Sequence, residues 1–176
     1  VWLPMSDGRP VRLTHYAPPA GVMARPDPVL ALHGYSASGT TFAHEALPEG
    51  GLAGALCRRG HHVWVADLRS SAGLESSREP WTFEMIGCQD IPMAVAYVHG
   101  QHSGQVHVVA HCMGAAMLSL GLFRRWPGDP AFTPHAAACR AMPERMGRLV
   151  LSQVGPAVTM SPANLARAYV FQWLKN

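Results

Sequence analysis

The stretch that most constrains the fold of this chain runs from Val108 to Ala115 and reads Val-Val-Ala-His-Cys-Met-Gly-Ala. Its first residues are apolar and β-branched, which is typical of a buried strand, and its later residues are small enough for a closely packed helix. One reactive side chain, Cys112, stands where the strand gives way to the helix. This order predicts a nucleophile elbow, in which a reactive side chain is held exposed on a sharp, strained turn.

Cys112 has two interpretations. Most free cysteines are buried and unreactive, and that alternative stays open. The strand-turn-helix context favours a nucleophile, because the unpaired N–H groups at a helix start stabilise negative charge. In that case the backbone N–H of Met113 is one expected donor to an oxyanion. The turn at His33-Gly34 is expected to point the backbone N–H of Tyr35 at the same place.

The other residues of the expected turn are interpreted as supporting ones. Ala110 and Gly114 are small, and bulky side chains there would keep the strand and the helix apart. We interpret His111 as a residue that packs beside the elbow rather than as a catalytic group. Asp67 closes an earlier strand, where an acid more often caps the following loop than takes part in catalysis.

Apolar runs and helical patterns alternate along the chain. Buried strands are expected over residues 28–32, 63–66, 106–110 and 149–152. Residues 9–16 alternate polar and apolar side chains after a turn at residues 6–8, which predicts an outer hairpin. Helices are expected over residues 52–59, 82–98, 113–125 and 161–174, and a loop over 127–143. Pro92 is expected to kink the second helix unless Asp90 caps a separate piece.

Strands separated by helices predict an α/β fold with a mostly parallel sheet covered on both faces. Ligands of such sheets bind beyond the carboxyl ends of the strands. The segments expected at those ends contain Gly34-Tyr35, Asp67, Cys112 and Gln153.

Composition excludes several classes of function. The net charge of +3 is small and scattered, so no nucleic-acid partner is expected. The four cysteines are widely spaced and the ten histidines are scattered, so we expect no metal site and a reducing, cytoplasmic compartment.

The uncharged stretch 106–123 is interpreted as a buried strand and helix rather than a transmembrane segment. No Gly-x-Gly-x-x-Gly pattern occurs, so no cofactor is expected in this segment.

A nucleophile of this kind needs a base and an acid that orients the base, and the expected chain order is nucleophile, acid, histidine. After Cys112 the chain holds one histidine, His135, and two acids, Asp129 and Glu144. All three precede the next expected strand, which is too early for those roles. The catalytic acid and histidine are therefore expected to lie outside these residues. Alone, the 176 residues are expected to be inactive and poorly stable, with an open sheet edge.

Three segments resemble the α/β-hydrolase fold: Leu32-His33-Gly34, residues 63–71 and residues 110–114. More narrowly, the His-Cys-Met-Gly turn, Val-Trp-Val-Ala-Asp-Leu-Arg-Ser-Ser and residues 149–154 resemble the hydrolase-like domain fused to flavin-dependent oxidoreductases of the glucose–methanol–choline group, including proteins labelled cholesterol oxidase. The sequence departs from the usual family pattern in having cysteine where serine is usual.

The resemblance implies hydrolysis of a small ester or lipid, or acyl transfer, with Cys112 as nucleophile and Tyr35 and Met113 as oxyanion donors. The alternative is a silent, hydrolase-like binding module attached to a flavoenzyme, whose FAD would belong to the fused domain. Residues 1–160 are expected to form the N-terminal core of an incomplete hydrolase domain, and residues 161–176 to begin a lid or the next helical segment.

Overall fold

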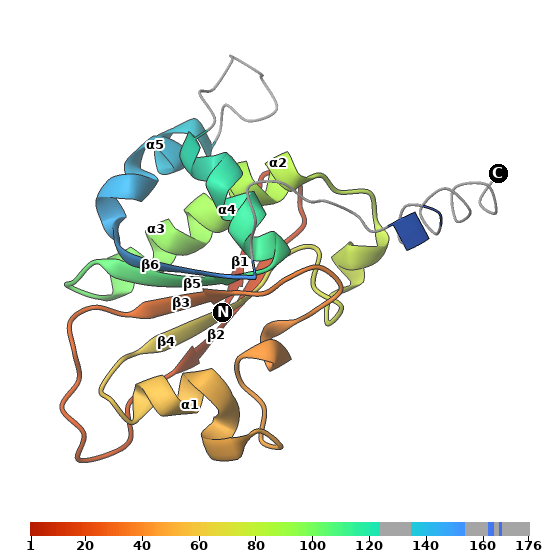
Figure 1. Cartoon of the computed structure of the whole chain (residues 1–176). Helices are drawn as coiled ribbons and strands as arrows, with labels where there is room; N and C mark the ends of the chain where they lie inside the picture. Colours follow the sequence, from red (N-terminus) through yellow and green to blue (C-terminus); the bar gives the residue numbers. More distant parts are fainter. Residues whose placement is uncertain (124–134, 154–161, 164–165, 167–176) are drawn as a thin grey trace.

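The structure is a computed structural model that describes residues 1–123, 135–153, 162, 163 and 166. Within those residues a single mixed sheet has the strand order β1-β2-β4-β3-β5-β6 (Figure 1). The strands are β1 (Trp2–Leu3), β2 (Val11–Tyr16), β3 (Val29–Leu32), β4 (Val63–Asp67), β5 (Val106–His111) and β6 (Met146–Ser152).

The central strands run parallel, as the alternation of strands and helices predicts. β3 pairs in parallel with β4 and β5, and β5 pairs in parallel with β6. β2 joins β4 antiparallel, and β1 joins β2 in the same way, so the predicted outer hairpin is confirmed. Every residue of β3 and β4 is buried, which is typical of parallel strands whose two faces are both covered.

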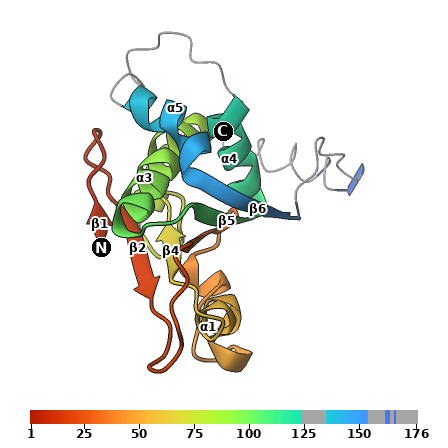
Figure 2. The same ribbon diagram turned by 90° about the vertical axis from the view of Figure 1, so that its left-hand side faces the viewer.

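Helices cover both faces of the sheet. α1 (Gly51–Cys57) lies on one face, and α3 (Ile91–Gln101), α4 (Met113–Phe123) and α5 (Ala136–Arg145) lie on the other (Figures 1 and 2). Shorter turns complete the connections. They are η1 (Gly39–Thr41), η2 (Pro48–Gly50), η3 (Glu75–Arg78), α2 (Phe83–Met85) and η4 (Ile86–Asp90). The larger apolar core lies on the α3 and α4 side, and a smaller one lies under α1.

The helical segment that begins at Thr82 runs without a break from α2 through the π-helical turn η4 into α3. Thr82 caps it as predicted, since its side chain accepts a hydrogen bond from the N–H of Met85. Asp90 has helical dihedral angles and forms no cap, so the two-piece alternative is wrong. Pro92 cannot donate to the carbonyl of Cys88, and the thiol of Cys139 lies 3.2 Å from that oxygen.

Two expectations in the second half of the chain need correction. The loop expected over residues 127–143 contains most of α5, which begins at Ala136. Its alanine-rich sequence has high helix propensity, and Cys139 and Met142, three residues apart, are its buried contacts. β6 begins at Met146, three residues before the expected start. The expected helix over 161–174 lies almost wholly outside the described residues, so the expected boundary at residue 160 stays a prediction.

The outer surface of β6 is apolar. Its neighbour is β5, and no second neighbour pairs with it among the described residues. Leu149, Val150 and Leu151 are 41%, 53% and 42% exposed. The predicted open sheet edge is therefore present in this part of the chain. In the described part of the chain, no helix has the length and apolarity required to cross a membrane.

Candidate active site

Cys112 occupies a strained turn between β5 and α4. Its φ angle is +54°, a left-handed conformation that costs a residue with a side chain about 1–3 kcal/mol. Two hydrogen bonds fix the turn: the N–H of Cys112 donates to the carbonyl of Ser152 at 2.8 Å, and the N–H of Ala115 donates to the carbonyl of Cys112 at 3.0 Å. The Cys112 side chain is partly exposed. The structure thus has the strand, strained residue and helix of the elbow pattern.

Two glycines allow the backbone to close around this turn. A methyl group on Gly34 would lie 2.9 Å from Cys112 Cβ and 3.5 Å from its Sγ. A methyl group on Gly114 would lie 2.5 Å from the carbonyl oxygen of His33. The loop after β3 therefore contacts both the reactive side chain and the first turn of α4. The small residue predicted at Gly114, and the glycine at position 34, are required by these contacts.

His33 holds that loop in place. It is 1% exposed, and its Nδ1 lies 2.7 Å from the carbonyl oxygen of Gly34. Its Nε2 accepts a hydrogen bond from the N–H of Leu68 at 3.2 Å, so the ring is neutral and carries its proton on Nδ1. Burial lowers the pKa of His33, although the hydrogen bond to Gly34 and the charge of Asp67 oppose that shift. The ring therefore connects the ends of β3 and β4.

The hydrogen bond to the Gly34 carbonyl also sets the direction of the next N–H group. The Gly34 carbonyl and the Tyr35 N–H belong to one trans peptide unit and point in opposite directions. The N–H of Tyr35 thus points away from the His33 ring. Among the described residues, neither this N–H nor that of Met113 donates a hydrogen bond within the protein. Their role as oxyanion donors stays a prediction.

The outer side of this region carries exposed aromatic side chains. The Tyr35 ring is 61% exposed, and its centroid lies 6.2 Å from that of Trp81. His111 lies on β5 beside β6, with its Nδ1 3.3 Å from Ser152 Oγ. His111 thus packs against the end of β6, and its supporting role at the elbow stays a prediction.

Asp67 forms a structural cluster at the carboxyl end of β4. Its carboxylate accepts hydrogen bonds from Ser71 Oγ at 2.6 Å, from the N–H of Gly39 at 2.8 Å and from Arg12 at 2.8 and 3.1 Å. Burial by itself raises the pKa of Asp67, but these hydrogen bonds and the Arg12 charge outweigh burial and hold the pKa below its ordinary value. The carboxylate is fully used in fixing the loops around it, as a loop-capping residue would be.

Sequence reasoning missed a buried ion pair just after β4. Arg69 and Asp90 are both 0% exposed, and Arg69 Nη2 lies 2.6 Å from Asp90 Oδ1. Asp7 makes a second ion pair with Arg69 at 2.5 Å. Arg69 belongs to the Val-Trp-Val-Ala-Asp-Leu-Arg-Ser-Ser stretch, but nothing in its spacing pointed to a partner on a helix about twenty residues away.

The base and acid that a cysteine nucleophile needs are not paired with Cys112 in the part of the chain that the structure describes. No carboxylate or imidazole there forms a hydrogen bond with Cys112 Sγ. His135 instead lies at the start of α5, where its Nε2 is 2.9 Å from Ser6 Oγ. Glu144 lies near the end of the same helix. Asp129 lies outside the described residues. The expectation that these three residues do not complete the catalytic set stays a prediction.

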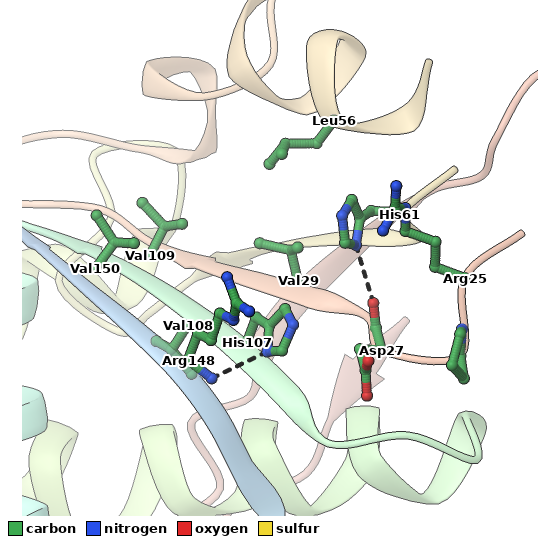
Figure 3. Close-up of a pocket in the computed structure, with 11 residues that line it drawn as sticks. Arg25, Asp27, Val29, Leu56, His61, His107, Val108, Val109, Arg148 and Val150 are labelled. Atoms are coloured by element: carbon green, nitrogen blue, oxygen red, sulfur yellow. Dashed lines mark hydrogen bonds between the residues drawn. The ribbon is translucent and has the colours of Figure 1, made fainter. Parts of the chain in front are cut away.

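The face of the sheet that α1 covers has a pocket of about 450 Å³ (Figure 3). His61 lies 3.1 Å from the carbonyl of Asp27 there, and the N–H of Arg148 donates to His107 at 3.0 Å. Leu56 of α1 lies on the opposite side of the pocket from these pairs (Figure 3). Cys112, Tyr35 and Met113 do not line this pocket, so it is separate from the elbow.

Comparisons with known proteins agree with this architecture. A family model described as "Alpha/beta hydrolase family" matches residues 29–175. No curated protein matches the sequence.

Solved structures with the same fold include three hydrolases. The chain has a TM-score of 0.56 and 15% identity with an alpha/beta hydrolase fold protein from Burkholderia ambifaria, covering 99% of this chain and 55% of that one. With a cold-adapted esterase from an Arctic intertidal metagenomic library, the TM-score is 0.54 and the sequence identity is 19%. That match covers 88% of this chain and 59% of the esterase. With esterase 2 of Thermogutta terrifontis, the TM-score is 0.54 and the sequence identity is 14%. That match covers 90% of this chain and 59% of the esterase. The chain spans less than two thirds of the length of each.

Proposed function

This chain belongs to the alpha/beta hydrolase family, and from that premise we propose that it supplies the nucleophile and the oxyanion site of an ester-cleaving or acyl-transferring enzyme. The observation that carries the proposal is the left-handed Cys112 at the strand-helix junction, with the Gly34 backbone packed against its Sγ. The esterases among the structural relatives support the reaction class. The substrate is a small ester or a lipid.

In the proposed reaction, the thiolate sulfur of Cys112 attacks the ester carbonyl carbon. A C–S bond forms, and the carbonyl oxygen becomes an oxyanion that accepts hydrogen bonds from the N–H groups of Tyr35 and Met113. The C–O bond then breaks, and the alkoxide leaves as an alcohol after it takes up a proton. Water, or another acceptor hydroxyl, attacks the thioester, releases the acyl group and restores the thiol. Removing one oxyanion donor typically costs about 3 kcal/mol of transition-state stabilisation.

The test is pre-steady-state hydrolysis of p-nitrophenyl acetate by the polypeptide that carries these residues. We expect a burst of p-nitrophenol equal to the concentration of protein, because p-nitrophenolate is a good leaving group that makes acylation faster than hydrolysis of the thioester. Cys112→Ala should abolish the burst. Cys57→Ala is the matched control, because Cys57 is a buried residue at the end of α1 and its replacement should leave the burst unchanged. A burst that survives Cys112→Ala would refute the proposal.

A second candidate function is a silent, hydrolase-like binding module attached to a flavin-dependent sterol or alcohol oxidoreductase. The observation that favours it is the lack of any described base hydrogen-bonded to Cys112 Sγ. It predicts no burst, and binding of a lipid or sterol that survives Cys112→Ala. The attachment to a flavoenzyme, with FAD in the fused domain, stays a prediction, and so does the cytoplasmic location.

A further inference from the structure

Three histidines that are far apart in the sequence meet at the edge of the sheet opposite to Cys112. His15 lies in β2, His62 directly precedes β4, and His102 follows α3. Each ring offers one nitrogen, and the three nitrogens lie within 4.8 Å of one another. His62 and His102 precede the amino ends of β4 and β5, whereas Cys112 follows the carboxyl end of β5. The cluster is therefore independent of the elbow.

The register of the strands explains why these side chains meet. His15 pairs with Trp64 across the β2–β4 ladder, so the two side chains share a face of the sheet. His62 precedes Trp64 by two residues and points to that same face. α3 covers this face, and its last residues place His102 at the edge of the Trp64 ring. There Trp64 Nε1 donates a hydrogen bond to His102 Nε2 at 2.9 Å.

We propose that His15, His62 and His102 bind one divalent transition-metal ion of the zinc, copper or nickel class. Imidazole nitrogens are preferred ligands of these ions, and three histidines with a remaining open position for water form a known zinc arrangement. His15 is exposed and the other two rings are partly exposed, so an ion can reach them.

The distances need only small side-chain movements. His15 Nε2 and His62 Nδ1 lie 2.9 Å apart, so one of these nitrogens carries a proton and donates a hydrogen bond to the other. Zn–N bonds of about 2.0–2.1 Å in a tetrahedral site place ligand nitrogens about 3.3 Å apart. The His15–His62 pair therefore opens slightly, and the third nitrogen moves inward by rotation of a partly exposed ring.

The hydrogen bonds that the cluster makes without an ion have to change when an ion binds. The indole of Trp64 donates a hydrogen bond to His102 Nε2, so an ion that binds through this nitrogen displaces that hydrogen bond.

The test is titration of the untagged, chelator-treated polypeptide with Zn²⁺ and with Co²⁺. We expect one equivalent of tightly bound ion, a visible Co²⁺ absorption band typical of a low-coordinate site, and a rise in the unfolding temperature on adding Zn²⁺. Single variants His15→Gln and His62→Gln should each weaken binding at least about tenfold and remove the temperature shift.

His61→Gln is the matched control. His61 adjoins His62 in the sequence, but its ring points to the carbonyl of Asp27 and away from the cluster. The His61→Gln variant should bind Zn²⁺ and Co²⁺ as tightly as the unmodified protein does. Circular dichroism spectra of all variants separate lost binding from lost folding. The proposal is overturned if Zn²⁺ and Co²⁺ do not bind, or if folded His15→Gln and His62→Gln variants bind them as tightly as His61→Gln does.

Discussion

Gly34 and Cys112 lie so close that any group larger than hydrogen on Gly34 would press on the sulfur-bearing side chain, since a methyl carbon there would lie 2.9 Å from Cys112 Cβ. Gly34 is also the residue whose carbonyl His33 holds at 2.7 Å. One peptide unit thus links a buried histidine, an available N–H group and the side chain of Cys112. The candidate site depends on that linkage.

Gly34→Ala should therefore displace the loop or the elbow. We expect a loss of about 1–3 kcal/mol of folding stability and a fall of at least about tenfold in the acylation rate. Urea unfolding and the p-nitrophenyl acetate burst measure the two effects. Gly100→Ala is the control. A methyl group at Gly100 would have no atom within 4 Å, and Gly100 is exposed near the end of α3, where alanine has the higher helix propensity. Equal behaviour of the two variants would mean that the contact with Cys112 does not matter.

His33 offers a second test with two matched variants. His33→Asn keeps a polar group near the position of Nδ1 and can still donate to the Gly34 carbonyl, whereas His33→Gln reaches the position of Nε2 and can accept from Leu68. Each variant leaves one buried group unpaired, at a cost of about 1–3 kcal/mol. If the Gly34 carbonyl sets the direction of the Tyr35 N–H, the Asn variant should retain more acylation than the Gln variant. The reverse order would contradict that role of His33.

Asp67 should make part of the stability depend on pH. Its pKa is lowered in the folded protein, so the folded state binds the proton less readily than the unfolded chain does. The stabilisation is present above the unfolded value of about 3.9 and is lost as the pH falls through the lower, folded value. Asp67→Asn should remove this part of the acid dependence and cost about 1–3 kcal/mol at neutral pH. Urea unfolding of both proteins from neutral to acidic pH measures it, and parallel curves would contradict the assignment.

The Arg69–Asp90 pair should be costly to break and less costly to remove. Asp90→Asn leaves the buried Arg69 charge with Asp7 as its remaining ion partner among the described residues, and we expect a loss of about 3–5 kcal/mol. Replacing both members, as Arg69→Met with Asp90→Leu, should lose less than the sum of the single changes. Urea unfolding of the two single variants and the double variant gives the coupling between the residues. Additive losses would show that the pair does not act as a unit.

Local patterns carried much of the fold. The elbow sequence predicted the end of β5 and the start of α4 to within one residue, and the apolar runs located β3 and β4. α5 was missed because the prolines, alanines and histidine of residues 127–143 suggested a loop. In the structure, Pro143 lies near the end of the helix.

The parts that the sequence could not reveal depend on contacts between distant residues. His15, His62 and His102 show no metal-ligand spacing, and only the register of β2 against β4 brings two of them together. Arg69 and Asp90 likewise meet through tertiary packing. At the elbow, by contrast, the residues are neighbours in sequence or follow a strand end. The turn and the close contact at Gly114 could therefore be predicted, while the roles of Tyr35 and Met113 stay predictions.

The most direct test of the central claim is the location of the acyl group. The polypeptide is mixed with p-nitrophenyl acetate, quenched in acid during the burst and digested, and the peptides are examined by mass spectrometry. We predict one acetyl thioester per molecule, on Cys112, and none on Cys57, Cys88 or Cys139, which are buried. Acetylation of a different residue, or a Cys112 that stays unmodified in a folded protein, would contradict the account.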